Sequence, residues 1–441
     1  MDSTTGPGAV PQDADVPRAG AWRTWLAIGC TGFGGPAGQL AILHREIVER
    51  RHWLSEEEFL AAMKVCMLLP GPEAQQVATY AGWRLGGIRG GLIAGGLFVL
   101  PGAVIVTLMA WLHAAGSSLP LVSAAFAGTR PAVVALVAFA AWRIGRKSLA
   151  TPAAGALAAV AGAALVAGVP FPLVVLVAAV VGWLLPLSPT PAGAAAATQA
   201  APADTSLEEA RAPAAAPSLS RLRLLVVTTL IAGVVWAAAF VLVRASGAAG
   251  GRGGEIATLF TETTLLSLGG AYAVVPWALD ESLARGWLEP AERFAALAMG
   301  EATPGPLILV VTFIGFLAGW KTDPGGAVPG LEGAAIATCF AFLPSFAVVF
   351  GIAPLVRRVK AGTRLARMMS AVGAVVVAAI VVLACRLAGA AFLPDGTFDP
   401  TAFVVAAACA AALFLKVGGA PLVVAAAAAF AVLRAVLWPG G

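Results

Sequence analysis

Long apolar runs follow one another along nearly the whole chain, and only short polar segments separate most of them. About a dozen of these runs approach the ~20 residues that an α-helix needs to cross a bilayer. Only 12% of the 441 residues are charged, against roughly 25% in a soluble domain. Because a backbone in lipid must satisfy its own hydrogen bonds, such runs fold as helices. The sequence therefore predicts an all-α, polytopic membrane protein.

Two of these runs are interrupted by the triplet Pro-Gly-Pro, at Pro70–Pro72 and at Pro304–Pro306. Proline lacks a backbone N–H and cannot continue a helix through its interior, so each triplet should divide its run into two half-helices. We expect Pro72 and Pro306 at the first position of the second half-helix, whose N–H groups and positive dipole end then face the break. Paired breaks of this kind indicate a transporter's binding site, and their polarity suits an anion.

The two halves of the chain share an ordered set of landmarks. Gly34-Gly35 matches Gly269-Gly270, Trp53-Leu54 matches Trp287-Leu288, Pro70–Pro72 matches Pro304–Pro306, and Leu100-Pro101 matches Leu343-Pro344. The spacing between partners is nearly constant up to the Pro-Gly-Pro triplets and is longer at the Leu-Pro pairs. We place the extra residues in the loop Lys321–Gly330, where insertion costs little. The pattern indicates an internal duplication.

The repeats and the polar segments divide the chain into five parts. These are a disordered tail at 1–21, a first transporter repeat at 22–187, an Ala/Pro-rich linker at 188–220, a connecting span at 221–254 and a second repeat at 255–441. An even number of spans in each repeat and one connecting span give about 13 membrane segments and place the repeats in opposite orientations. The Lys and Arg distribution favours a cytoplasmic N-terminus. Re-entrant broken segments would give fewer crossings.

The glycine pairs have two interpretations. Glycine permits sharp turns and close approach of the backbone to a ligand, but small residues are also common where membrane helices pack together. A Pro-Gly-Pro triplet follows each pair, which favours a binding site at the breaks. The predicted substrate-binding residues are Gly34, Gly35, Pro36, Pro70, Gly71, Pro72, Gln75, Arg130, Gly269, Gly270, Pro304, Gly305 and Pro306.

Arg130 is included because it lies near the middle of an apolar run. A central arginine costs at least about 2.5 kcal/mol on insertion scales, so something should compensate its charge. An anionic substrate would do so, since the guanidinium fork suits a tetrahedral oxyanion. An internal partner, or snorkelling in a shifted span, would serve equally well.

Four other charged residues are candidates for coupling transport to an ion: Glu73, Lys64, Glu262 and Glu301. Glu73 directly follows the first Pro-Gly-Pro, at the positive start of a half-helix, where it would either carry a proton or cap the helix. Lys64 lies close to the start of its run and has the alternative of snorkelling. Glu262 and Glu301 lie inside or at the edge of apolar runs in the second half.

Several function classes find no support. The chain has no GxxxxGK[ST] loop for ATP, and its histidines and cysteines show no metal-ligand spacing. We therefore predict no metal, no cofactor and no catalytic residue. The net charge of +5 comes from small basic groups between spans, which fits loop bias better than nucleic-acid binding.

These landmarks resemble the chromate ion transporter family over about residues 22–390. In the first half the resemblance rests on Gly32–Pro36, Trp53-Leu54 with Glu56–Phe59, and Leu69–Pro72. In the second half it rests on Leu266–Pro276, Gly286–Leu288 and Ala302–Pro306. One departure is Leu268 with Ala271, where the family often has Phe and a third Gly. This difference weakens the expectation of equivalent anion sites in the two halves.

The resemblance implies a secondary transporter in the cytoplasmic (inner) membrane, with chromate as substrate and sulfate as its structural analogue. It implies chromate export and chromate resistance, driven by the proton-motive force or by anion exchange. The alternatives are a carrier of the same fold for sulfate or another anion, a channel, and a membrane enzyme that modifies an oxyanion. The expected partners are the anion and the lipid bilayer, and the sequence leaves open whether the protein is a homo-oligomer.

Overall fold

The computed structural model of the chain describes residues 20–185, 219–268, 270–323, 326–353, 356 and 363–438. Every regular element within these ranges is a helix, which confirms the predicted all-α class. The predicted N-terminal tail and the linker at 188–220 lie almost entirely outside the described residues, and so does Gly269.

The helices of the first half are α1 (Ala21–Thr31), α2 (Gly35–His44), the π-helix η1 (Arg45–Arg50), α3 (Glu56–Cys66), α4 (Glu73–Ala115), α5 (Pro120–Ser148), α6 (Pro152–Val166) and α7 (Phe171–Leu184). The connecting helix is α9 (Leu219–Ser246). The second half consists of α10 (Gly253–Leu266), η4 (Ala271–Ala273), α11 (Val275–Ala284), α12 (Glu292–Ala302), η5 (Leu307–Leu309), α13 (Val310–Trp320), α14 (Ala327–Ile352), α15 (Thr363–Phe392), η7 (Pro394–Gly396), α16 (Pro400–Phe414) and α17 (Ala420–Leu437).

Six helices among the described residues are long and apolar enough to cross a membrane. They are Glu73–Ala115, Pro120–Ser148, Val226–Ser246, Ala327–Ile352, Arg364–Phe392 and Ala420–Leu437. Other apolar helices have only 10–17 residues, which is short for a full crossing of a bilayer core about 30 Å thick. The chain is a multi-pass membrane protein, and its predicted total of about 13 segments stays a prediction.

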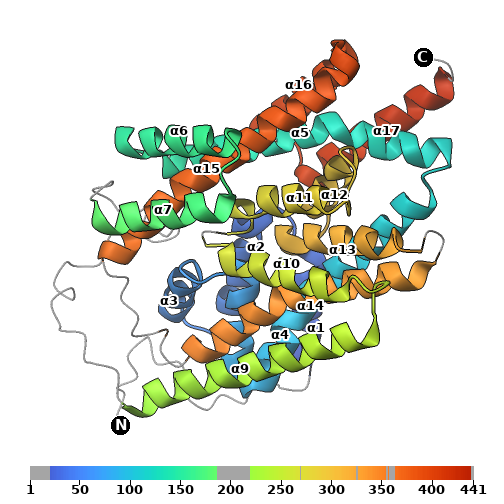
Figure 1. Ribbon diagram of the computed structural model, residues 1–441. Helices are drawn as coiled ribbons and strands as arrows, with labels where there is room; N and C mark the ends of the chain where they lie inside the picture. The colour runs from blue at the N-terminus through green and yellow to red at the C-terminus, as the bar shows by residue number, and fades with distance from the viewer. Residues whose placement is uncertain are drawn as a thin grey trace, which may run out of the picture.

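The helices pack into two groups (Figure 1). One group contains α5, α6, α7, α15, α16 and α17, in which α5 packs against α15, α16 and α17 while α15 packs against α6 and α7. The other contains α1, α4, α9, α10, α13 and α14. The short helices α2, α11 and α12 lie between the groups in this view, and α12 packs against both α5 and α13.

The two halves contain similar elements in the same order. Each begins with a helix, a glycine-containing break and a shorter helix, and each continues through a further helix to a Pro-Gly-Pro break. In the first half the next element is α4, whose backbone is not helical at Gly86 and Gly87. In the second half, a loop after Trp320 separates α13 from α14. An internal duplication would give this shared order, and the duplication and the placement of its extra residues in that loop stay predictions.

The prolines that close the two breaks differ by one position from the expectation. Pro72 has an extended backbone and is the N-cap of α4, and Pro306 is likewise the N-cap of η5. Neither is the first helical residue. Proline fits the cap position equally well, because its fixed φ is also compatible with extended backbone and it need not donate an N–H.

Candidate functional site

The chain is interrupted at four places that come together in space. We name them the first break (Gly32–Gly34), the second (Met67–Pro72), the third (the described residues Ser267, Leu268 and Gly270) and the fourth (Thr303–Pro306). The first and fourth breaks join through the Gly305 amide, which donates to the Gly32 carbonyl over 3.0 Å. The second and third join through the Gly71 amide, which donates to Ser267 Oγ over 2.9 Å. Each Pro-Gly-Pro triplet is therefore held by the break of the opposite half.

Gln39 on α2 strengthens the first of these pairs. Its side-chain Nε2 donates to the Gly305 carbonyl at 2.5 Å and to the Gly32 carbonyl at 3.2 Å. The side chain is only 1% exposed. A buried carbonyl without a donor costs about 1–3 kcal/mol, so this one amide stabilises two interrupted segments at once.

The two helices that contain the Leu-Pro pairs, α4 and α14, also pack against the breaks. Gly102 on α4 contacts the fourth break so closely that a Cβ there would lie 2.0 Å from the Pro304 carbonyl oxygen. On α14, Ser345 Oγ donates to Gln75 Oε1 over 2.7 Å. A Cβ on Gly71 would lie 2.8 Å from the same Ser345 Oγ. Each Pro-Gly-Pro triplet is therefore in close contact with a residue of the opposite half. Gly102, which follows Pro101, contacts the second triplet, and Ser345, which follows Pro344, contacts the first.

This arrangement changes one part of the expectation. The amides of the two central glycines, Gly71 and Gly305, already donate within the protein and do not face a ligand. What remains available at the breaks is the start of the following helices. In the described part of the chain, the N-terminus of α2 has no side-chain cap, and Gly34 before it adopts a left-handed backbone with φ 93°. The N-terminus of α2 is thus a partial positive charge without a fixed partner.

Arg143 on α5 adds a full positive charge at this point. Its Nη2 lies 3.8 Å from the position that a Cβ on Gly35 would occupy. The guanidinium also lies near the Tyr272 hydroxyl and the Glu301 carboxylate. Tyr272 donates to Glu301 over 2.6 Å. The start of α2 is therefore surrounded by a cation, a hydroxyl and a carboxylate that the hydroxyl already engages.

The start of α4 has a different electrostatic character. Its first residue, Glu73, is half-buried, and its Oε1 lies 3.2 Å from the position that a Cβ on Gly270 would occupy. Among the described residues, no hydrogen bond or ion pair engages this carboxylate. An anion at this helix start would meet a carboxylate of the same charge. The starts of α2 and α4 therefore offer unequal sites for an anion.

The remaining predicted residues lie at different distances from the breaks. Arg130 is 13 residues before Arg143 on α5, which is about 20 Å along a helix that rises 1.5 Å per residue, and its neighbours are on α16 and α17. Lys64 and Glu262 are exposed on the surfaces of α3 and α10. Gln75 and Glu301 do lie at the breaks. Gln75 accepts a hydrogen bond from Ser345, and Glu301 accepts one from Tyr272.

Reasoning from the sequence missed five residues that shape this site: Gln39, Arg143, Ser267, Tyr272 and Ser345. Two of them carried a signal. Ser267 is the counterpart of Gly32 in the second half, because the two are separated by the same number of residues as Gly35 and Gly270. Tyr272 is one of only two tyrosines in the chain. Arg143 stands in a basic group at the end of an apolar run, which gave it the appearance of a loop residue. Its contact with α2 depends on how α5 packs, which local sequence does not determine.

Comparison with known proteins agrees with this architecture. A family model described as chromate transporter matches residues 20–183 and 254–433. A chromate transport protein of Pseudomonas aeruginosa is 33% identical over 351 residues, which cover 78% of this chain and 74% of that protein. A chromate transport protein of Cupriavidus metallidurans is 26% identical, covering 76% and 77%. No solved structure matches the chain. With its four breaks joined across the two halves and a family model that matches both, the chain belongs to the chromate transporter family.

Proposed function

We propose that the protein exports chromate from the cytoplasm and binds it at the start of α2, beside Gly34, Gly35, Pro36 and Arg143. The observation that carries this proposal is the contact of the Arg143 guanidinium with a glycine-rich helix start that has no side-chain cap in the described structure. A helix start contributes about 0.3–1 kcal/mol toward a surface anion and up to ~2 kcal/mol where it is partly buried. A guanidinium adds bidentate hydrogen bonds to two oxygens of a tetrahedral oxyanion.

The Pro-Gly-Pro triplets have a supporting role in this proposal. Because their central amides are used within the protein, they fix the relative positions of the two halves. We infer that the halves are an inverted repeat, with the N-terminus cytoplasmic, and that the cross-half contacts at the breaks rearrange during transport. Such rocking of one repeat against the other around a central site would give alternating access in the inner membrane.

Glu73 would link transport to a proton. An ionised Glu73 carboxylate, which no hydrogen bond or ion pair engages in the described structure, would oppose the binding of a dianion at the breaks, because like charges repel strongly in a low dielectric. Glu73 is therefore expected to be neutral when chromate is bound, so that anion and proton bind together. Export of a dianion with one proton moves one net negative charge outward, which a negative interior favours by about 2.3 kcal/mol per 100 mV. The membrane potential would then drive export and confer chromate resistance.

Chromate flux into inside-out vesicles tests the function. Vesicles that contain the protein should accumulate labelled chromate in a saturable manner, with sulfate as a competing analogue, and collapse of the membrane potential should slow accumulation. A preference for sulfate over chromate would identify a sulfate carrier of the same fold. Chemical conversion of chromate by the purified protein would instead reveal an enzyme. Equal flux in vesicles without the protein would remove the proposal.

Replacing Glu73 by glutamine should remove the pH dependence of chromate binding. In the wild-type protein the apparent affinity should fall as pH rises, because proton and anion bind together and the coupling is reciprocal. The variant keeps the shape of the side chain without its charge, so its affinity should be nearly constant between about pH 7.5 and pH 9, where chromate is almost wholly the dianion, as measured by binding titrations over this range. Glu262→Gln is the matched control, since Glu262 is exposed on α10. An unchanged pH dependence in Glu73→Gln would show that another group carries the proton.

A further inference from the structure

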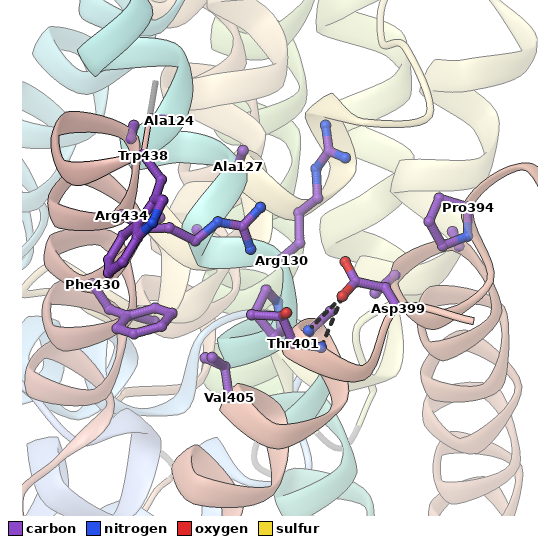
Figure 2. Close-up of a pocket in the computed structure, with 18 residues that line it drawn as sticks. Ala124, Ala127, Arg130, Pro394, Asp399, Thr401, Val405, Phe430, Arg434 and Trp438 are labelled. Carbon is purple, nitrogen blue, oxygen red and sulfur yellow. Dashed lines mark hydrogen bonds between the residues drawn. The ribbon is translucent and has the colours of Figure 1, made fainter. Parts of the chain in front are cut away.

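A second polar region lies in the group of helices that contains α5, α15, α16 and α17, away from the breaks. It is a cavity of about 290 Å³ bounded by the first half of α5, the end of α15, the start of α16 and the end of α17. Figure 2 shows the side chains of Arg130 and Arg434 at this cavity, with Asp399 on one side and with Phe430 and Trp438 on the other. Arg130 was the predicted substrate ligand that the breaks do not explain.

The charges in this cavity leave an excess of positive charge. Asp399 accepts hydrogen bonds from the amides of Thr401 and Ala402 at 2.9 and 3.0 Å, and so it caps α16. In the described part of the chain, the guanidinium groups of Arg130 and Arg434 have no hydrogen bond and no ion pair. The lining of the cavity thus contains two guanidinium groups and one carboxylate, and the start of a helix already stabilises that carboxylate. An anion with several oxygens would satisfy both arginines.

The position of the cavity indicates the depth of this anion in the membrane. Arg434 stands in the last turn of α17 and Trp438 directly follows that helix. Arginine and tryptophan at the end of an apolar span are typical of the membrane–water boundary. The loop between α15 and α16, which supplies Pro394 and Asp399 to the cavity, lies at the same level. The cavity is therefore at the depth of lipid headgroups.

An adjoining hollow continues from the cavity along α17. It is about 420 Å³ in volume and shares Thr401, Phe430, Arg434 and Trp438 with the cavity. Its other lining residues are the exposed apolar side chains Leu433 and Leu437. A free inorganic anion would use the charged cavity alone. A ligand with an anionic head and a hydrocarbon tail would fill both spaces.

We propose that Arg130 and Arg434 bind the phosphate group of an anionic phospholipid, whose acyl chain lies along Leu433 and Leu437 of α17. Basic pockets between membrane helices are suited to such headgroups. The same cavity could take free inorganic phosphate through the two guanidiniums alone, and the experiment below distinguishes the two sources. In either case Arg130 serves a site about 20 Å along α5 from the breaks.

Lipid retention by the full-length protein tests this site. The protein is purified in mixed micelles of detergent with equal amounts of phosphatidylglycerol and phosphatidylcholine, and the retained lipids are quantified by mass spectrometry. We expect the wild-type protein to retain phosphatidylglycerol at least tenfold over phosphatidylcholine, and the variant Arg130→Gln/Arg434→Gln to lose this preference. Arg434→Gln alone should lose part of this preference. Because Arg434 is exposed at the end of a helix, the single variant should fold normally and still tests the site if the double variant misfolds.

Arg146→Gln is the control, because Arg146 lies on the same helix but stacks over Trp142, outside the cavity. This variant should retain phosphatidylglycerol like the wild-type protein. In a second arm, 10 mM inorganic phosphate is added to protein loaded with phosphatidylglycerol, and no displacement is expected. Displacement by phosphate would overturn the lipid assignment in favour of a free-anion site. Equal lipid preference in the wild-type protein and in both cavity variants would also overturn it.

Discussion

Replacing Gly71 by alanine is expected to reduce chromate flux at least tenfold while the protein still inserts into the membrane. Gly71 has φ 123°, a region that residues with a side chain avoid, and it is the central residue of the first Pro-Gly-Pro triplet. An added Cβ would lie 2.6 Å from Gln76 Nε2 and 2.8 Å from Ser345 Oγ. The conformation alone costs about 1–3 kcal/mol for a residue other than glycine. The collisions add to this cost and separate the two halves at the place where Gly71 donates to Ser267.

The matched control is Gly96→Ala on the same helix as Gly102. Gly96 is helical, and a Cβ there meets nothing within 4 Å. Alanine is a better helix former than glycine by about 0.8–1 kcal/mol, so this variant should transport like the wild-type protein or be slightly more stable. Flux in inside-out vesicles, normalised to the amount of inserted protein, measures both variants. Wild-type flux in Gly71→Ala would show that the cross-half contact at the second break is not needed for transport.

The sequence predicted those features of the fold that follow from local rules. Apolar runs required helices, and proline and glycine located the breaks near Gly34, Gly71, Gly270 and Gly305. These predictions succeed because a missing N–H or a missing Cβ acts within one or two residues of its position. The one-residue difference at Pro72 reflects the same rule, since proline fits an N-cap as well as the first helical position.

The parts that could not be predicted depend on packing between distant segments. Arg130 lies near the middle of its apolar run and was a predicted ligand, whereas Arg143 follows the end of that run and was not a candidate. The rotation and depth of α5 determine which arginine reaches the breaks. They place Arg143 beside Gly35 and Arg130 beside α16 and α17. The link from Gln39 to Gly305 spans 266 residues and has no local signature. Hydropathy gives the position of a charge along a helix but not the neighbour that it faces.

Arg143→Gln is therefore expected to weaken chromate binding by about 30-fold or more, whereas Arg146→Gln should bind normally. A hydrogen bond to a charged group contributes about 1.5–3 kcal/mol, and each 1.4 kcal/mol is a factor of about ten in affinity. The loss of the guanidinium also leaves Glu301 close to the anion without its neighbouring cation. Arg146 is three residues away on α5 and stacks over Trp142, so its variant changes the net charge of the helix equally without altering the start of α2.

Arg143→Lys adds a test of geometry, because lysine keeps the charge but not the planar fork. Its affinity should fall between those of the wild-type protein and Arg143→Gln. Equilibrium binding of labelled chromate to purified protein measures all three variants without depending on transport rate. If Arg143→Gln and Arg146→Gln weaken binding equally, the effect comes from net charge alone and the anion does not sit at the start of α2. A deficit confined to position 143 requires a local contact, because general electrostatic attraction would respond to either charge.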